Sequence, residues 1–467
     1  MWGVLLACPI PMAFFIDVFR MTNLQAELSK IAEAPYVLRR DSFGCVLYRR
    51  SSKDYILCDK NALDILSACQ QEDASRAYDI LPENVRTQLS RVSYDQFVNL
   101  CSSVDILEGG RFKGCILDND FVNSKHHLSA PLRVHLQLTR YCNLKCPYCW
   151  ADAGMPQDHE LTLRDLDNLF AQLCAMGVFI LDIGGGEPLG RKDFPEVVAL
   201  ANRYGMCVNV STNAALATKS IEERLSKVKI NSFRISMDAG SEKIYDNIRG
   251  VRSYRKAMRG IAHLRNACPT AGIYFHVTVF RDNCSEIPSI VKKAEELKVD
   301  KLIFNIALPV GRAATFPRQV LKPEEITKTI EIISNISQSN PLNIEIECLT
   351  PPKRPQRRSF EGFGCECGRT RVHISSNGFV YPSGLLSMYP AWKAGDVRKT
   401  RFFDIWNKSS VLETWRSDAV NRKCKTCSKV ASCRGGCRTR AFILTNDIKS
   451  KDPFCNFSGD DQTQESR

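Results

Sequence analysis

Residues 139–151 read TRYCNLKCPYCWA and contain three cysteines, Cys142, Cys146 and Cys149, in the spacing C-x3-C-x2-C. A four-iron, four-sulfur cluster is normally held by four Cys thiolates. A loop that supplies only three of them leaves one iron able to bind a molecule that is not protein. The spacing therefore predicts an iron–sulfur cluster with an open iron, and a zinc knuckle is the alternative that the triplet by itself leaves open.

Three later segments each join a short apolar run to small polar residues. They read LDIGGGEPLGR at 181–191, VNVSTNAA at 208–215 and FRISMDAGS at 233–241. Together with the cysteine triplet, these segments stand in the order typical of the radical S-adenosylmethionine (SAM) enzymes. The chain resembles this family over about residues 132–307.

The resemblance implies a cofactor and a set of residues around it. In the family, the amino and carboxylate groups of SAM chelate the open iron, and an added electron splits SAM into methionine and a 5′-deoxyadenosyl radical. The cofactor carries the difficult chemistry, while the protein binds and orients it. The resemblance places Tyr148 near the adenine, Gly185, Gly186 and Glu187 at the amino group, Ser211 and Asn213 near the ribose, Ser236 near the carboxylate, and Arg249 as a further carboxylate contact. It assigns no catalytic base.

Strand and helix patterns alternate across the same region, which predicts a parallel sheet with helices outside. Six such units predict an α/β fold, a partial (β/α)6 barrel similar to a TIM barrel, with one side open to a large substrate such as a peptide. Ligands collect at the carboxyl ends of the strands in such barrels. The predicted strands are 134–138, 178–183, 206–211, 232–237, 273–280 and 301–306.

A second group of cysteines runs from Cys424 to Cys437 in the spacing C-x2-C-x5-C-x3-C, with Cys455 further on. Upstream, residues 364–385 read GCECGRTRVHISSNGFVYPSGL. These segments resemble the SPASM extension of peptide-modifying radical SAM enzymes, which carries two auxiliary iron–sulfur clusters. That pattern assigns one cluster to Cys424, Cys427, Cys433 and Cys455, and the other to Cys367 and Cys437 with Cys365 as a third candidate. A zinc ribbon is the alternative, because C-x2-C pairs also suit tetrahedral zinc.

Two neighbouring residues depart from this pattern. Five residues after Gly378, where the family usually has a cysteine, this chain has Ser383. A serine alkoxide is a rare iron ligand, so we expect the first auxiliary cluster to be incomplete, smaller or open to substrate. Sulfatase-maturing relatives have an aspartate base at the next position, which is Gly384 here, and this difference argues against formylglycine formation.

Residues 34–110 predict a small α+β domain in front of the barrel. Strand patterns at 36–38, 45–48 and 55–58 predict a three-stranded meander, and helical patterns follow at 59–69, 83–92 and 94–103. This winged-helix layout resembles the peptide-recognition domain, similar to protein D of pyrroloquinoline quinone (PQQ) biosynthesis, found fused to enzymes that modify ribosomally made precursor peptides. There the leader peptide adds a strand to the exposed sheet edge. A merely structural cap is the alternative.

Composition and patterning set the remaining boundaries. They predict an N-terminal tail at 1–33, in which either Met21 is the true start or the first segment is disordered. The further predicted parts are a linker at 111–131, the radical SAM core at 132–345, the auxiliary iron–sulfur domain at 346–457, and a disordered tail at 458–467. The apolar run at 2–16 is too short to cross a bilayer, so no membrane association is expected. The proposed clusters require a reducing compartment, which predicts a cytoplasmic protein.

The overall charge is basic, with a formal net charge of +13 and 25% charged residues. Basic residues are spread along the chain, and no basic stretch is interleaved with aromatic residues as in nucleic-acid-binding modules. Nucleic acid is therefore a disfavoured partner. A surface suited to an acidic peptide is the alternative explanation of the charge.

Together these features predict a radical SAM oxidoreductase that matures a ribosomally made peptide. It would abstract hydrogen from the precursor peptide and form a carbon–carbon, ether or thioether crosslink, with epimerisation or backbone excision less favoured. The N-terminal domain would bind the peptide, and a flavodoxin or ferredoxin would supply electrons. Two other classes stay open: a radical SAM enzyme acting on a small molecule such as a tetrapyrrole or quinone precursor, and a non-catalytic iron–sulfur or zinc protein that binds peptide or nucleic acid.

Overall fold

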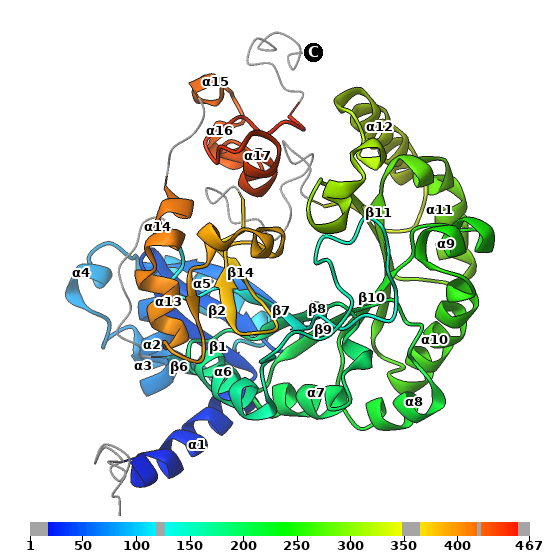
Figure 1. The fold of residues 1–467 in the computed structure, drawn as a ribbon. Helices are drawn as coiled ribbons and strands as arrows, with labels where there is room; N and C mark the ends of the chain where they lie inside the picture. The colour runs from blue at the N-terminus through cyan, green and yellow to red at the C-terminus, as the bar shows by residue number, and fades with distance from the viewer. Residues whose placement is uncertain (1–16, 118–126, 348–364, 418–421, 456–467) are drawn as a thin grey trace, which may run out of the picture.

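A computed structural model of the chain describes residues 17–117, 127–347, 365–417 and 422–455. Its central part is the predicted barrel, in which parallel strands lie side by side in chain order with helices outside (Figure 1). The six predicted strands are confirmed as β7 (Arg133–Thr139), β8 (Ile180–Gly185), β9 (Cys207–Thr212), β10 (Ser232–Ser236), β11 (Gly272–Val279) and β12 (Lys301–Ile306). The helices around them are α6 (Leu163–Ala175), α7 (Phe194–Arg203), α8 (Lys219–Leu225), α9 (Glu242–Arg249), α10 (Ser253–Ala267), α11 (Ile287–Glu296) and α12 (Pro323–Ser339).

The barrel strands separate apolar from polar side chains by their two-residue period. Along β11, alternate residues such as Phe275 are buried and join the core that the helices share, while the residues between them, such as His276, stay partly exposed on the other face. The strand register places His135 of β7 beside Asp182 of β8. The inner face of the barrel is therefore a polar surface, and the apolar core lies between the strands and the helices.

The sheet is wider than the sequence predicted. A short strand, β13 (Ile344–Ile346), pairs parallel with β12, so the predicted boundary at residue 345 falls inside a strand. At the other edge, β14 (Arg371–Ile374) pairs parallel with β7, and β15 (Phe379–Tyr381) and β16 (Gly395–Asp396) continue the sheet antiparallel. The first part of the predicted auxiliary domain thus extends the barrel sheet. These strands have two to four residues, which is too short for their period to show in sequence.

The N-terminal domain contains the predicted meander, with some changes around it. Strands β1 (Tyr36–Asp41), β2 (Gly44–Arg49) and β3 (Asp54–Asp59) pair antiparallel, and the Asp59 side chain caps α2 (Lys60–Gln71). The helix predicted at 83–92 ends at Arg86, because Ser90 caps the next helix, α5 (Arg91–Ser103). The remaining elements are α3 (Ala74–Ala77), α4 (Glu83–Arg86), β4 (Leu107–Glu108), β5 (Arg111–Phe112) and β6 (Gly114–Leu117).

Two segments predicted as tail and linker are partly structured. Residues 17–33 form helix α1 (Asp17–Glu33), whose Leu28 is buried against the barrel near Cys174 and Phe179. In the predicted linker, β6 pairs parallel with β1 and adds a fourth strand to the N-terminal sheet. Pairing between strands so far apart in the chain leaves no local sequence signal. The apolar run at 2–16 and the predicted tail at 458–467 lie outside the described residues.

The N-terminal domain is docked on the barrel by buried polar contacts. The Arg39 guanidinium is 1% exposed and donates to the carbonyl oxygens of Ala130 (2.9 Å) and Met176 (3.2 Å). The Tyr55 hydroxyl accepts from the backbone N–H of Phe179 at 2.8 Å. These contacts join the N-terminal sheet to the start of β8, so domain and barrel pack as one body.

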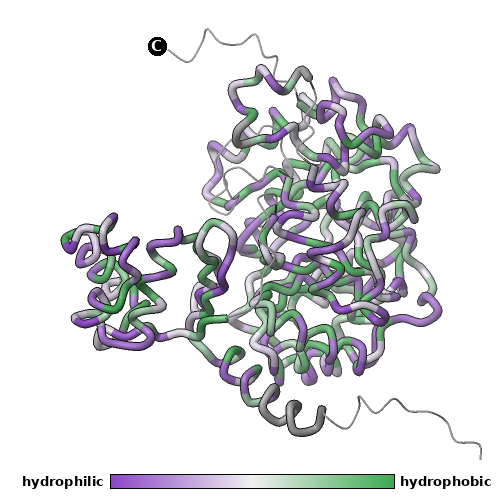
Figure 2. The backbone as a smooth tube through the Cα atoms, turned by 90° about the vertical axis from the view of Figure 1, so that its left-hand side faces the viewer, coloured by the Kyte–Doolittle hydropathy of each residue, from purple (hydrophilic) through white to green (hydrophobic). Residues whose placement is uncertain are grey.

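The C-terminal part beyond β16 consists of short helices joined by loops. Its helices are α13 (Phe402–Lys408), α14 (Ser410–Arg416), α15 (Arg422–Lys425), α16 (Val430–Cys433) and α17 (Arg438–Thr445). Hydrophilic and hydrophobic stretches alternate along the coloured part of the tube in Figure 2. None of the helices among the described residues has the length and apolar character needed to span a bilayer.

Candidate iron–sulfur and cofactor site

The cysteine triplet lies on the loop that leaves the carboxyl end of β7, called the cluster loop here (residues 140–154). The backbone N–H of Cys142 donates to the Gly154 carbonyl at 2.8 Å, and the N–H of Gly154 donates to the Arg140 carbonyl at 2.9 Å. Cys146 is buried, and Cys142 and Cys149 are half-buried. The loop therefore closes on itself and presents its three thiols from one compact segment.

Arg312, in the 3-10 turn η4 (Gly311–Thr315), holds the cluster loop from outside. Its Nε donates to the Cys146 carbonyl at 2.9 Å, and its Nη1 donates to the Ala153 carbonyl at 2.7 Å and to Asp152 Oδ1 at 2.9 Å. Sequence reasoning missed this residue, because no motif surrounds it. A planar guanidinium fixes several acceptors at once, so Arg312 orders the loop on which the cysteines lie.

The predicted glycine pair is required by the cluster loop itself. Gly185 has φ +135°, and a Cβ on it would lie 2.4 Å from the Thr139 carbonyl oxygen. A Cβ on Gly186 would lie 2.1 Å from the Tyr141 carbonyl oxygen. Backbone contacts this short allow only glycine. The pair thus lets β8 and the cluster loop approach each other, and the contact with the SAM amino group that the resemblance implies for it stays a prediction.

The Glu187 carboxylate is fully buried and ties β9 to the glycine segment. It accepts hydrogen bonds from Thr212 Oγ1 (2.6 Å), Asn213 N–H (2.7 Å) and Leu189 N–H (3.1 Å). Burial raises its pKa to about 6, although these hydrogen bonds act in the opposite direction. Both carboxylate oxygens already have protein partners, so Glu187 positions the strand ends in this structure.

Asn213 reaches the cluster loop directly. Its Nδ2 donates to Asn143 Oδ1 at 2.9 Å and lies 4.0 Å from Cys142 Sγ. The other predicted strand-end residues are Ser211 in β9 and Ser236 in β10, and both are half-buried. The roles predicted for these residues toward SAM stay predictions.

Asp238 connects the cluster loop to helix α9 and strand β11, and sequence reasoning missed its role. Its carboxylate is fully buried and accepts from Arg249 Nε (2.9 Å) and Nη2 (2.6 Å), from the Thr278 N–H (2.8 Å) and from the Tyr148 hydroxyl. Burial by itself lowers the pKa of Arg249, and the neighbouring Asp238 raises it well above its ordinary value. Arg249 therefore has an internal partner, and its predicted contact with a SAM carboxylate stays a prediction. An acidic residue inside the quoted FRISMDAGS segment was the available signal.

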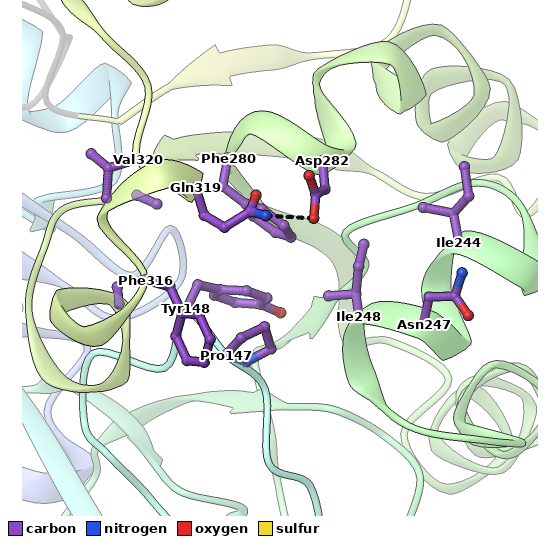
Figure 3. A pocket seen from close by; sticks show the side chains of 12 residues that line it. Pro147, Tyr148, Ile244, Asn247, Ile248, Phe280, Asp282, Phe316, Gln319 and Val320 are labelled. Atoms are coloured by element: carbon purple, nitrogen blue, oxygen red, sulfur yellow. Dashed lines mark hydrogen bonds between the residues drawn. The ribbon is translucent and has the colours of Figure 1, made fainter.

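A cavity of about 410 Å³ opens beside the cluster loop, within the size range of small-molecule sites. The Tyr148 and Phe280 rings stack in it with centroids 4.8 Å apart, and Ile248 of α9 faces them across the space (Figure 3). Gln319 donates to Asp282 at its rim at 2.7 Å. Aromatic and aliphatic walls with a polar rim suit a flat heteroaromatic ring. The adenine contact that the resemblance implies for Tyr148 stays a prediction.

The C-terminal cysteines lie near one another in two sets, and the cluster that each set would hold stays a prediction. The Cys365 thiol is hydrogen-bonded with the thiols of Cys367 and Cys437, and these contacts hold its pKa well below the ordinary value. Burial raises the pKa of the Cys424 thiol, and the nearby thiols of Cys455 and Cys427 add to the effect. Burial and Cys455 likewise raise the pKa of Cys433 to about 11, so these four cysteines lie near one another. Within the described ranges, no three His, Cys, Asp or Glu side chains converge on a single metal ion. An iron–sulfur cluster does not need that arrangement, because each thiolate binds a different iron.

Ser383 and Gly384 lie at the start of the turn η6 (Gly384–Met388), next to the barrel's inner face. A Cβ on Gly384 would lie 3.1 Å from the Trp150 ring, 3.2 Å from His373 Nδ1 and 3.5 Å from His135 Nδ1. Trp150 directly follows Cys149 of the triplet. The position that the resemblance links to an acidic base is thus occupied here by a glycine that faces two imidazoles.

Comparisons with known proteins agree with this architecture. The sequence profile of the radical SAM superfamily matches residues 136–294, and that of the SPASM iron–sulfur cluster-binding domain matches residues 365–428. An AdoMet-dependent heme synthase of Nitratidesulfovibrio vulgaris is 30% identical over 342 residues, which cover 69% of this chain and 91% of the relative. The mycofactocin maturase MftC of Mycobacterium tuberculosis is 28% identical, over 70% of this chain and 83% of the relative.

Among solved structures, Streptococcus suis SuiB bound to S-adenosylmethionine is similar with a TM-score of 0.67 and 21% identity, over 90% of this chain and 97% of SuiB. A protein with a barrel of this kind, a three-cysteine loop at its strand ends and a second cysteine group is a radical SAM enzyme. The chain belongs to the radical SAM superfamily and carries a SPASM iron–sulfur domain. Its cofactors are a four-iron, four-sulfur cluster, SAM and auxiliary iron–sulfur clusters, and the cluster loop, the adjoining cavity and the paired cysteine groups fit them.

Proposed function

We propose that this protein matures a ribosomally made precursor peptide by crosslinking it. When bound, the cluster and SAM would supply a 5′-deoxyadenosyl radical that takes a hydrogen atom from the peptide. The chain's own residues have other tasks: Arg312 and Asp238 hold the cluster loop in place, and the polar inner face of the barrel receives the substrate. SuiB has been solved with its precursor peptide SuiA, and that neighbour resembles this chain across its N-terminal domain as well, with 91% of the chain covered.

The observation that carries the peptide proposal is the edge of the N-terminal sheet. In the order β3-β2-β1-β6, β3 pairs only with β2 among the described residues. A free strand edge presents unpaired N–H and C=O groups that can pair with another chain. Leu57 in the middle of β3 is 36% exposed. We infer that the leader peptide adds a strand along β3, and that Leu57 contacts it.

A binding measurement tests this inference. The probes are the short peptides encoded by the open reading frames that flank the gene, each labelled with a fluorophore and titrated with the anaerobic holoenzyme. Leu57→Asp should weaken binding at least tenfold, because it places a charge against an apolar contact. Val251→Asp, at an 83% exposed position on the barrel, is the matched control and should leave binding unchanged. Equal affinities of the wild type and Leu57→Asp would remove the edge-binding proposal.

A second candidate function is the modification of a tetrapyrrole, because heme synthases are among the chain's relatives. A tetrapyrrole-modifying enzyme would consume its substrate at the same rate whether Leu57 is replaced or not. Incubation of the reduced holoenzyme with iron-coproporphyrin and mass analysis would detect it. We further propose a cytoplasmic location, and electron supply by a flavodoxin or ferredoxin; reduction by either protein in place of dithionite would support the latter.

A further inference from the structure

Two histidines from neighbouring strands form a pair on the inner face of the barrel. His135 of β7 and His373 of β14 are in register, and their Nδ1 atoms lie 2.9 Å apart. A hydrogen bond between two Nδ1 atoms requires one of them to carry a proton and the other to accept it. The pair lies against Trp150, with ring centroids 6.4 Å and 5.9 Å from its indole. Because Trp150 follows Cys149, the pair adjoins the cluster loop.

A structural histidine usually has hydrogen-bond partners at both ring nitrogens, and this pair departs from that arrangement. His373 is 1% exposed, and its Nε2 has no hydrogen-bond partner among the described residues. Buried polar atoms of this kind are rare. His135 Nε2 lies 3.0 Å from the place that a Cβ on Gly184 would take. Glycines at 184 and 384 therefore let the two imidazoles take these places, because a Cβ at either position would crowd a ring nitrogen.

We propose that the His135–His373 pair is the proton acceptor for substrate bound in the barrel. This proposal rests on the peptide-crosslinking function above. After hydrogen abstraction, closure of the new bond releases one proton and one electron from the substrate. The proton goes to His135 Nε2, and an auxiliary iron–sulfur cluster held by the C-terminal cysteines would take the electron. His135 is partly exposed, whereas His373 is buried, so His135 faces the substrate.

The pair must be neutral before it accepts a proton, and its surroundings favour that state. Burial lowers the pKa of His135 to about 4, with Asp182 acting against burial and Arg234 and Arg371 acting with it. Burial also holds the pKa of His373 well below its ordinary value, and His135 adds to the effect. Glu347 is the remaining charged group that faces His135. Once His135 has taken the proton, its Nδ1–Nδ1 contact with His373 becomes a hydrogen bond with a charged donor, which partly offsets the cost of the buried charge.

The test separates proton transfer from SAM cleavage. His135→Gln and His373→Gln keep a polar side chain of similar size but remove the basic ring nitrogens that could take up a proton. Each should still form 5′-deoxyadenosine with peptide present, while the crosslinked peptide per 5′-deoxyadenosine falls about 10²- to 10⁴-fold, the usual worth of general base catalysis. His263→Gln, on the outer helix α10, is the control and should leave this ratio unchanged. An unchanged ratio in His135→Gln would overturn the proposal.

Two further readouts keep the outcome clear. If the wild type itself makes no 5′-deoxyadenosine, the proposed function fails, and not the pair alone. The chain has only seven histidines, so ¹⁵N spectra of the holoenzyme, assigned with the two Gln variants, can report the charge of each imidazole. The proposal expects both to be neutral at pH 7, with a proton on one of the two Nδ1 atoms. A charged imidazole in either residue at pH 7 would contradict it.

Discussion

The buried ion pair of Asp238 and Arg249 allows a quantitative prediction. Asp238 is fully buried and Arg249 is 7% exposed, and two charge-assisted hydrogen bonds of 2.9 Å and 2.6 Å join them. Asp238→Asn leaves the guanidinium without its counter-charge in a site that water does not reach. Breaking a buried pair from one side costs about 3–5 kcal/mol. Because the Tyr148 hydroxyl also donates to Asp238, we expect weaker SAM binding as well as a lower melting temperature.

The chain offers a control of matched chemistry and different burial. Arg281 and Glu325 form a similar two-bond pair at 3.0 Å and 2.7 Å, but their side chains are 36% and 35% exposed. Exposed pairs contribute only about 0–1 kcal/mol, so Glu325→Gln should hardly change the melting temperature. The double variant Asp238→Asn with Arg249→Gln removes the orphaned charge and should melt higher than Asp238→Asn alone. Equal shifts in Asp238→Asn and Glu325→Gln, or a double variant that melts below both single ones, would refute the reasoning.

Three other predictions concern the cluster loop and the domain contact. Arg312→Lys keeps the charge but loses at least one of three hydrogen bonds, which costs about 2 kcal/mol. A chelator should therefore remove iron from the variant holoenzyme faster than from the wild-type holoenzyme. An unchanged rate would contradict the role of Arg312. The folded protein raises the pKa of Glu187 to about 6 from 4.5, so the ionised carboxylate disfavours folding above pH 6 and stability is regained as the pH falls toward 4.5. Glu187→Gln should flatten this part of the plot of melting temperature against pH. A plot like that of the wild type would contradict the prediction. Arg39→Met leaves the carbonyls of Ala130, Pro131 and Met176 without this donor and should lower the melting temperature by several degrees. Arg40→Met, at an exposed neighbouring position, should not.

The parts of the fold that were predictable are those with local signals. The barrel strands are apolar runs with turn residues at their ends, and the cysteines stand at fixed spacings, so both could be read from the chain. Strands β13 and β14 could not, because each has only three or four residues and their pairing joins segments far apart in the sequence. The same reason explains the missed side chains. These side chains are Arg312, Asp238, His135 and His373, and each makes contacts between elements that lie far apart in the sequence rather than within a motif.

The central claim is that the three cysteines of the cluster loop hold a cluster that cleaves SAM. The direct measurement is the 5′-deoxyadenosine formed when anaerobically reconstituted, dithionite-reduced protein is incubated with SAM. The wild type should form it, and a variant with Cys142, Cys146 and Cys149 all replaced by Ala should not. Formation by the wild type at no more than the level of the triple variant would contradict the account.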